Sequence, residues 1–177
     1  MKLDIAYYGD PILRKRGEPV TEFNDELRQF VKDMEETMFA YRGVGLAAPQ
    51  VHKSLRLFLI NWWDRDEDGK IIPNKTWVFI NPKIIDISEE TFNQEEGCLS
   101  IPRIYETVAR PIKVTIEAQD EYGNTFTETF ENWIAKAVLH ENDHINGVLF
   151  IDRLPAKRRK ELDTTLNAIK RKYYLNK

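Results

Sequence analysis

The chain has 177 residues, of which 31% are charged and 42% are hydrophobic, and its formal net charge is −3 at pH 7. These values are typical of a soluble globular protein, and we expect residues 1–177 to form a single domain with one substantial core. The sequence has no apolar run of about 18 residues and no signal peptide at Met1–Tyr8, which predicts a cytoplasmic protein that does not bind membranes.

An extended N-terminal arm is followed by an amphipathic helix that should begin after Asn24 and end near Gly43. Asn24 is the expected N-cap, and apolar residues then recur at spacings of three and four, at Leu27, Phe30, Val31, Met34, Met38 and Tyr41. The next run, from Gly43 to Gln50, is rich in small residues. Such residues let the backbone approach a ligand closely, although a simple helix-to-strand turn would have the same composition.

Strands should dominate the middle of the chain. Residues 55–61 and 77–80 are apolar and β-branched, and the polar segment 64–70 between them indicates an exposed loop. Residues 112–119 alternate between apolar and polar side chains, which predicts a half-buried strand. After a turn at residues 120–124, Phe126 and Phe130 mark the returning strand of a hairpin.

The following helix, with Asn132 as its expected cap, carries the sequence His140-Glu141-Asn142-Asp143-His144. Residues four apart lie on one face of a helix, so His140 and His144 could bind one divalent ion. Glu141 could then act as general base on a water at that ion. The helix is apolar on most sides, and a buried Glu141 is costly without a metal or a hydrogen bond. A chance occurrence of the five-residue motif remains the alternative.

A catalytic site of this type needs a third protein ligand. Phe150 occupies the position where one metalloprotease group has its third histidine, and Glu161 lies in a charged run that should be solvated. Cys98, the only cysteine, cannot form an internal disulfide and offers a soft thiolate, so Cys98, His140 and His144 would complete the site. A lone cysteine can also be a small buried hydrophobe. Glu96 and Arg110 are expected to form an ion pair that braces the segment around Cys98.

The C-terminal segment from about residue 155 predicts a basic helix. It holds eight Lys or Arg residues and two Asp or Glu residues, a net charge of +6, which leaves −9 on the rest of the chain. Such a helix could bind a polyanion or could simply be a solvated face.

Three stretches of the sequence, in the same order and spacing, resemble the peptide deformylase family. They are the glycine-rich run Gly43 to Gln50, the cysteine segment Glu96 to Ser100 and the helix segment His140 to His144. The resemblance implies an α+β fold in which antiparallel sheets surround a buried central helix carrying the HExxH motif, with a further C-terminal helix. It also implies a hydrolase that removes the N-formyl group from the formylmethionine of nascent polypeptides.

The resemblance assigns roles to further residues. The Gln50 side chain and the Leu99 backbone N–H would stabilise the oxyanion. Val44, Gly45 and Gly97 would bind the peptide through backbone groups, and the methionine pocket would lie near Val44, Trp133 and Ala137. The family pattern differs here at three positions, Leu139, Tyr105 and His52.

The implied cofactor is one divalent ion per chain, Fe²⁺ in the cell, with Zn²⁺, Ni²⁺ or Co²⁺ able to use the same ligands. The expected partners are formyl-Met nascent peptides and, through the basic helix, the ribosome. We expect a monomer that does not bind DNA. Two alternatives are a metallopeptidase that uses the same motif and a non-catalytic module that binds nascent chains or ribosomes.

Overall fold

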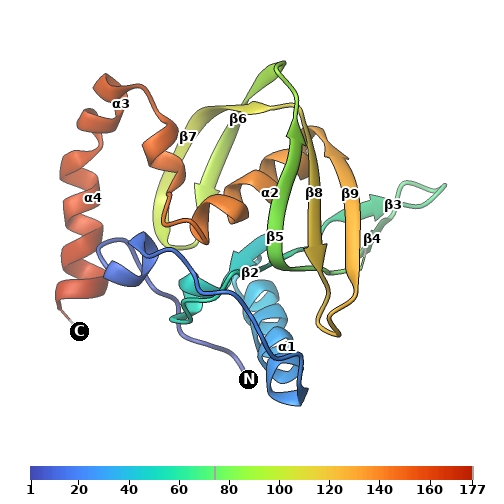
Figure 1. Cartoon of the computed structure of the whole chain (residues 1–177). Helices are drawn as coiled ribbons and strands as arrows, with labels where there is room; N and C mark the ends of the chain where they lie inside the picture. The colour runs from blue at the N-terminus through green and yellow to red at the C-terminus, as the bar shows by residue number, and fades with distance from the viewer. Residues whose placement is uncertain (74, 177) are drawn as a thin grey trace.

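The computed structural model describes residues 1–73 and 75–176. It confirms the predicted α+β class with antiparallel sheets (Figure 1). The elements, in chain order, are η1 (Pro11–Arg14), α1 (Asp25–Ala40), β1 (Gly45–Ala47), η2 (Ala48–Val51), β2 (Leu57–Ile60), β3 (Trp63–Arg65), β4 (Ile71–Pro73), β5 (Trp77–Ile87), β6 (Thr91–Cys98), β7 (Ile101–Pro111), β8 (Lys113–Gln119), β9 (Thr125–Glu131), α2 (Asn132–His144), η3 (Phe150–Arg153), α3 (Ala156–Glu161), α4 (Asp163–Lys170) and η4 (Arg171–Leu175).

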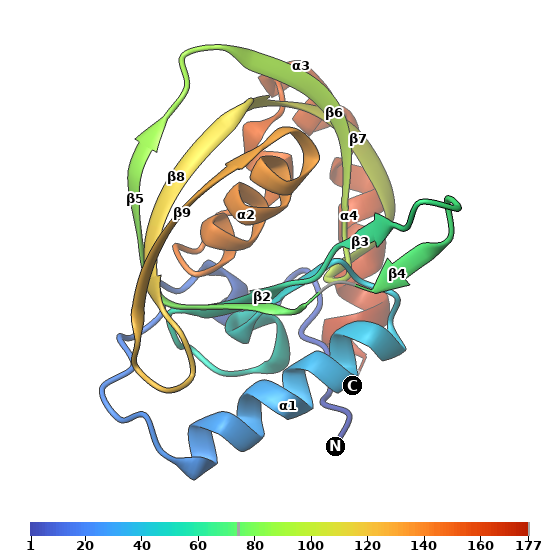
Figure 2. The ribbon, with the colours of Figure 1, turned by 90° about the vertical axis from the view of Figure 1, so that its right-hand side faces the viewer.

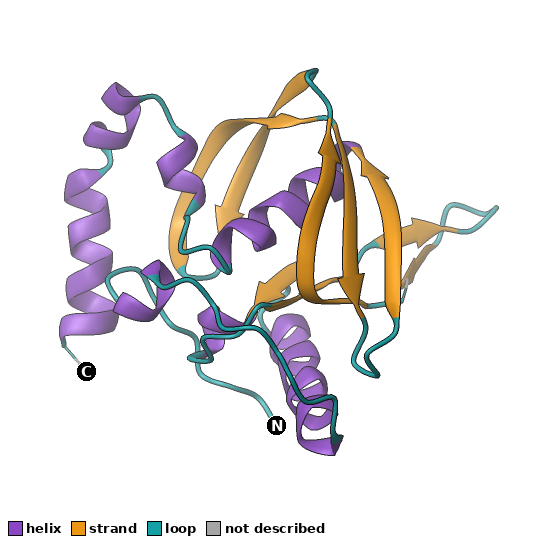
Figure 3. Cartoon of the chain, in the orientation of Figure 1, coloured by secondary structure: helices purple, strands orange, loops and turns teal. Residues whose placement is uncertain are grey.

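The sheets lie around α2. A five-stranded antiparallel sheet in the order β1-β2-β5-β8-β9 curves along one side, and the separate β6–β7 hairpin lies on the other (Figure 2). Helix α2 contacts β1, β2, β7, β8 and β9, whereas the other helices lie outside the sheets (Figure 3). The small β3–β4 hairpin extends away from this arrangement (Figure 2).

Strand β2 is buried on both faces. Because side chains alternate along a strand, Leu57 and Leu59 face the cluster under α1, while Phe58 and Ile60 face the cluster around α2. Full burial of a Leu or Phe side chain stabilises the fold by roughly 1.5–3 kcal/mol. Strand β2 therefore separates two hydrophobic layers and positions α2 relative to α1.

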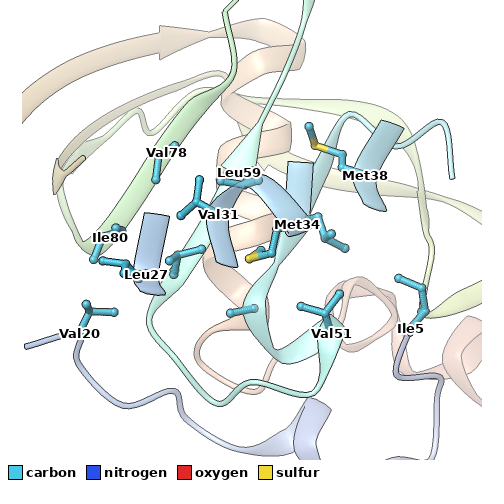
Figure 4. Close-up of a cluster of buried hydrophobic side chains, with 13 residues drawn as sticks. Ile5, Val20, Leu27, Val31, Met34, Met38, Val51, Leu59, Val78 and Ile80 are labelled. Atoms are coloured by element: carbon cyan, nitrogen blue, oxygen red, sulfur yellow. The ribbon is translucent and has the colours of Figure 1, made fainter. Parts of the chain in front are cut away.

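Helix α1 begins as predicted, because the Asn24 side chain accepts a hydrogen bond from the Leu27 N–H at 3.0 Å. Its apolar stripe packs on the sheet, with Leu27, Val31 and Met34 near Leu59 (Figure 4). The helix ends at Ala40, slightly before the predicted end.

The cap predicted for α2 is wrong. Glu131 precedes the helix without a capping side chain, and Asn132 is the first helical residue, with a φ of 58°. The Asn132 N–H donates to the Ile112 carbonyl at 2.8 Å, so the chain turns directly from β9 into α2 with no linker. Asparagine tolerates this left-handed conformation better than most residues do.

Three other expectations about local structure need correction. The predicted loop 64–70 is partly the β3–β4 hairpin, in which Arg65 pairs with Ile71. Strand β5 continues to Ile87 instead of ending at Ile80, with a register shift between Ile80 and Lys83. The β6–β7 hairpin was not predicted, and its tip carries Cys98.

The C-terminal segment has close to the predicted extent, but the single predicted helix is interrupted at Leu162 and forms α3 (Ala156–Glu161) and α4 (Asp163–Lys170), followed by η4 (Arg171–Leu175). Leu162, Leu166 and Ile169 pack with Phe150 and Ile151 in a buried cluster, so this segment is part of the core as well as a charged surface. Within residues 1–73 and 75–176, no helix combines the length and apolar character needed to cross a membrane.

Candidate metal centre

Helix α2 brings His140 and His144 together on its inner face. They lie one turn apart, and their ring centroids are 5.1 Å from each other. Ala135, Ala137 and Val138 of the same helix pack in the cluster against the sheet. Both imidazoles are therefore held inside the protein, with 9% of His140 and 1% of His144 exposed.

Cys98 approaches these histidines from the end of β6. Its Sγ lies 3.3 Å from His144 Nε2, and the ligand atoms of Cys98, His140 and His144 all lie within 4.8 Å of one another. Ligands bound at about 2.0–2.3 Å to one tetrahedral ion lie roughly 3–4 Å apart. One thiolate and two imidazoles in this arrangement fit a single divalent transition metal.

The two imidazoles are in different electrostatic environments. Burial alone would lower the pKa of His140, but its hydrogen bonds with Cys98 and Glu96 outweigh burial and raise that pKa well above its ordinary value. Burial lowers the pKa of His144 well below its ordinary value and so keeps that imidazole neutral, the form that binds metal.

The orientation of His140 is set by Glu96. Glu96 Oε1 lies 2.8 Å from His140 Nδ1, which leaves Nε2 as the ring nitrogen available to a ligand. The predicted ion pair of Glu96 with Arg110 is present: Arg110 Nε and Nη2 donate to the two carboxylate oxygens at 2.8 and 2.9 Å. Burial alone would raise the pKa of Glu96, but the hydrogen bonds from Arg110 and His140 outweigh it and lower the pKa to about 2.

Glu141 lies beside the three ligand atoms, with Oε1 4.0 Å from His140 Nε2. The carboxylate is buried, and its Oε2 has no hydrogen-bond partner among the described residues. Burial raises the pKa of Glu141 to about 7. A buried carboxylate oxygen without a partner is costly, and a water or substrate proton at this position would satisfy it.

Gln50 is held by both ends of its amide. The Ala47 N–H donates to Gln50 Oε1 at 2.9 Å, while Gln50 Nε2 donates to Ser100 Oγ at 3.2 Å and lies 3.4 Å from Cys98 Sγ. The carbonyl side of the amide is thus occupied, and the NH₂ group faces the cysteine. The contact between Gln50 and Ser100 was not predicted, because the two residues lie on different elements that meet only in the folded chain.

A cavity of about 820 Å³ opens over these groups. The predicted peptide-binding residues all line it, together with the proposed catalytic residues, and the set is Val44, Gly45, Gly97, Trp133, Ala137, Gln50, Leu99 and Glu141. Cys98 and His140 reach the same cavity, whereas His144 and Arg110 lie behind it. The sequence did not indicate the rim residues Arg42, Arg103 and Lys136.

The structure shows the surroundings of two residues that depart from the family pattern, Tyr105 and His52. The Tyr105 ring covers Gly97, because a β-carbon at Gly97 would lie 2.6 Å from Tyr105 Cε1. His52 ends η2 in a left-handed conformation, with its Nδ1 3.5 Å from Asp10 Oδ2.

Comparisons with known proteins place this geometry in a family. Residues 2–160 match the family model described as polypeptide deformylase. A peptide deformylase of Pseudothermotoga lettingae is 45% identical over 155 residues, which is 88% of this chain and 84% of the relative. The crystal structure of the Plasmodium falciparum peptide deformylase has a TM-score of 0.86 at 37% identity and covers 96% of each chain. A Met-Ala-Ser-bound peptide deformylase of Acinetobacter baumannii has a TM-score of 0.80 at 32% identity and covers 87% of this chain and 99% of that one.

Proposed function

The chain belongs to the polypeptide deformylase family, and we propose that Cys98, His140 and His144 hold the metal with which it removes the N-formyl group of nascent polypeptides. The observation that carries this assignment is the convergence of three ligand atoms within 4.8 Å, beside the buried Glu141 carboxylate and under a cavity. A bound divalent ion would polarise the formyl carbonyl and make water more acidic.

Glu141 is the proton carrier in this proposal. Its unpartnered Oε2 accepts a proton from the water that attacks the formyl carbon. When the C–N bond breaks, Glu141 returns the proton to the nitrogen of the departing amine. The products are formate and a peptide with a free N-terminal methionine.

Gln50 and Leu99 donate to the oxygen that becomes negative when water attacks. Because the Ala47 N–H occupies Gln50 Oε1, only the NH₂ group of this amide can face the reacting carbonyl. The amide plane is therefore set before substrate arrives, and the N–H that faces Cys98 Sγ at 3.4 Å is the one that would turn to the reacting oxygen. The Leu99 backbone N–H would supply the second donor.

The formyl peptide would lie in the cavity between the segments at Gly45 and Gly97. Backbone groups of Val44, Gly45 and Gly97 pair with the peptide backbone, which admits many sequences after the first residue. The methionine side chain would occupy the apolar part of the cavity at Val44, Trp133 and Ala137. Met-Ala-Ser, bound to the Acinetobacter relative, is the product expected from formyl-Met-Ala-Ser.

The ligand set suits several ions. We assign Fe²⁺ as the ion in the cell and expect Zn²⁺, Ni²⁺ or Co²⁺ to bind the same three residues, because a thiolate with two imidazoles does not discriminate strongly among them.

The C-terminal helix is the part of the chain suited to the ribosome. Several of its cations already have partners, since Arg158 binds Glu106 and Arg159 binds Asp163. Lys157, Lys160 and Arg171 are exposed and are among the cations left for a polyanion such as ribosomal RNA.

The deciding experiment is a formate assay on protein purified without oxygen, with metal analysis of the same sample. We expect formate release from formyl-Met-Ala-Ser, one divalent ion per chain, and no cleavage within longer unformylated peptides. Endopeptidase activity would favour the metallopeptidase alternative. Metal without any formate release would favour the non-catalytic module.

A further inference from the structure

Asp143 is a buried charge that the proposed reaction does not use. It lies on α2 between the two histidines, is 7% exposed and does not line the cavity. Two arginines donate to its carboxylate: Arg110 Nη1 to Oδ2 at 2.7 Å, and Arg153 Nη2 to Oδ1 at 2.8 Å. Arg153 Nε adds a further bond to Oδ2 at 3.2 Å. A carboxylate held by this many charge-assisted bonds has little freedom to move.

Arg110 connects Asp143 to the histidine that Glu96 orients. Its planar guanidinium gives two N–H groups to Glu96 and one to Asp143, and the side chain is 5% exposed. Because two carboxylates bind different edges of this planar group, both its position and the orientation of its plane are fixed. The contacts therefore form one series, in the order Arg153, Asp143, Arg110, Glu96 and His140 Nδ1, which is half-exposed at Arg153 and buried from Asp143 onward.

The charges of this series explain why it can be buried. Arg110 and Arg153 together offset Glu96 and Asp143, so no net charge is left uncompensated next to the proposed metal. Loss of the Asp143 charge would leave Arg110 with one carboxylate partner and a free edge. Glu96 would then be held less firmly, and so would the imidazole that it orients.

We propose that Asp143 is a positioning residue, which locks Arg110 against Glu96 and thereby holds His140 in the orientation needed to bind the metal. This inference rests on the proposed metal site. Asp143 touches neither substrate nor metal in this arrangement, and its effect should therefore appear first in metal retention rather than in peptide binding.

The test is the rate at which Zn²⁺-loaded or Co²⁺-loaded protein releases its ion to an excess of chelator. Loss of a residue that supports a metal ligand typically lowers metal affinity by about 10- to 100-fold. We expect a loss in this range for Asp143→Asn, seen as faster release of the ion than from the wild type. Asn142→Ala is the matched control, because Asn142 lies on the same turn and, within the described residues, its side chain makes no hydrogen bond, whereas its backbone carbonyl accepts one from Asn146 Nδ2. Equal release from Asp143→Asn and the wild type would overturn the inference.

A second variant separates positioning from simple electrostatics. Arg153→Gln removes a positive charge near the metal, so electrostatics alone would slow metal release. Positioning instead requires faster release, by less than in Asp143→Asn, because Asp143 loses one of its two anchors. Slower release would therefore contradict the proposal. The Arg153 side chain is 49% exposed, and this variant keeps the test available if Asp143→Asn does not fold.

Metal binding by the wild type distinguishes failure of the proposed metal site from failure of the role proposed for Asp143. If it binds no divalent ion, the proposed metal site is wrong. If it binds the ion and all variants release it equally, the metal site stands and only the role of Asp143 fails.

Discussion

The backbone of Gly45 passes directly under the carboxylate of Glu141, and a β-carbon added to Gly45 would lie 2.6 Å from Glu141 Oε1. A non-bonded carbon and oxygen atom do not approach this closely in proteins, so any side chain at residue 45 must displace the Glu141 carboxylate. Beside its proposed role in peptide binding, the glycine-rich run thus leaves room for Glu141.

Gly45→Ala should lower turnover of a formyl peptide by about a hundredfold, the cost of moving a reacting group by roughly 1 Å. Metal content should stay near that of the wild type, because no ligand is touched. Gly43→Ala is the control: its β-carbon would lie 3.2 Å from Leu99 Cδ1, a flexible side-chain end that can adjust. Normal turnover in Gly45→Ala would mean that the position of Glu141 does not limit the reaction.

Glu141→Ala should keep the metal and lose at least about a hundredfold in turnover, the lower end of what a positioned acid or base contributes. Formate release and metal content are measured on the same preparation. Near-normal turnover would remove Glu141 from the mechanism.

Cys98→Ser should weaken metal binding or change the ion that is retained. A serine hydroxyl is a harder and more weakly ionised donor than a thiolate, whereas both histidines stay in place. Metal analysis after dialysis, together with the formate assay, gives the result. Unchanged metal content and turnover would require another third ligand.

The Arg14–Asp152 pair, which joins η1 to η3, should contribute to stability in a pH-dependent way. Burial alone would raise the pKa of Asp152, but hydrogen bonds from Arg14 and the Leu149 N–H lower it below its ordinary value. This stabilisation is therefore present above the unfolded pKa, about 3.9, and is lost as pH falls through the lower folded pKa.

Asp152→Asn should accordingly lower the free energy of unfolding at pH 7 by about 1 kcal/mol, since the pair is partly exposed. Urea unfolding at several pH values would show the difference from the wild type shrinking below about pH 4. Asp25→Asn, at a fully exposed partner of Arg28, should change little. A difference that persisted unchanged in acid would contradict the assignment.

Ribosome binding is best tested without removing the C-terminal helix, because Leu166 and Ile169 of α4 belong to the core. Replacing Lys157, Lys160 and Arg171 with Gln should weaken co-sedimentation with ribosomes and lower its salt dependence. Each lost phosphate contact lowers the slope of log affinity against log salt by about 1. Turnover of a short formyl peptide should not change.

The matched control for that variant replaces three exposed lysines elsewhere on the body with Gln, at Lys15, Lys32 and Lys83. If both triple variants sediment like the wild type, the basic helix is only a solvated surface.

The parts of the site that could be predicted are those that depend on local spacing or on distinctive chemistry. His140 and His144 meet because they are one helical turn apart, and Cys98 was identifiable as the only thiolate. The Glu96–Arg110 pair followed from the cost of a free charge near a ligand. Asp143 and Ser100 gave no such signal, because their partners come from other elements and are set by the packing of the whole fold.

The missed strands have a similar cause. Asn81 and Pro82 are residues that usually end a strand, yet β5 continues past them. The Asn81 side chain bonds the backbone of Val20 on both sides, accepting from its N–H at 2.8 Å and donating to its carbonyl at 2.9 Å. These bonds tie the bulge to the N-terminal arm, while the Asn81 backbone N–H donates to the Arg56 carbonyl at 2.9 Å. Strand β6 is polar along most of its length, and its pairing with β7 is visible only in the register of the hairpin.

The separateness of the β6–β7 hairpin has a consequence for folding. Within the described residues it pairs with no other strand, so side-chain contacts such as Glu96 with His140 and Lys136 with the Glu95 carbonyl hold it against α2. An ion bound by Cys98 and the two histidines would join the hairpin to the helix as a cross-link does. Its binding free energy would then count as folding free energy. Loss of the ion would leave the hairpin tip held by the buried Ile101 and by the Tyr8 N–H bond to the Ser100 carbonyl, so opening and proteolysis there should increase while the sheet beneath α2 stays closed.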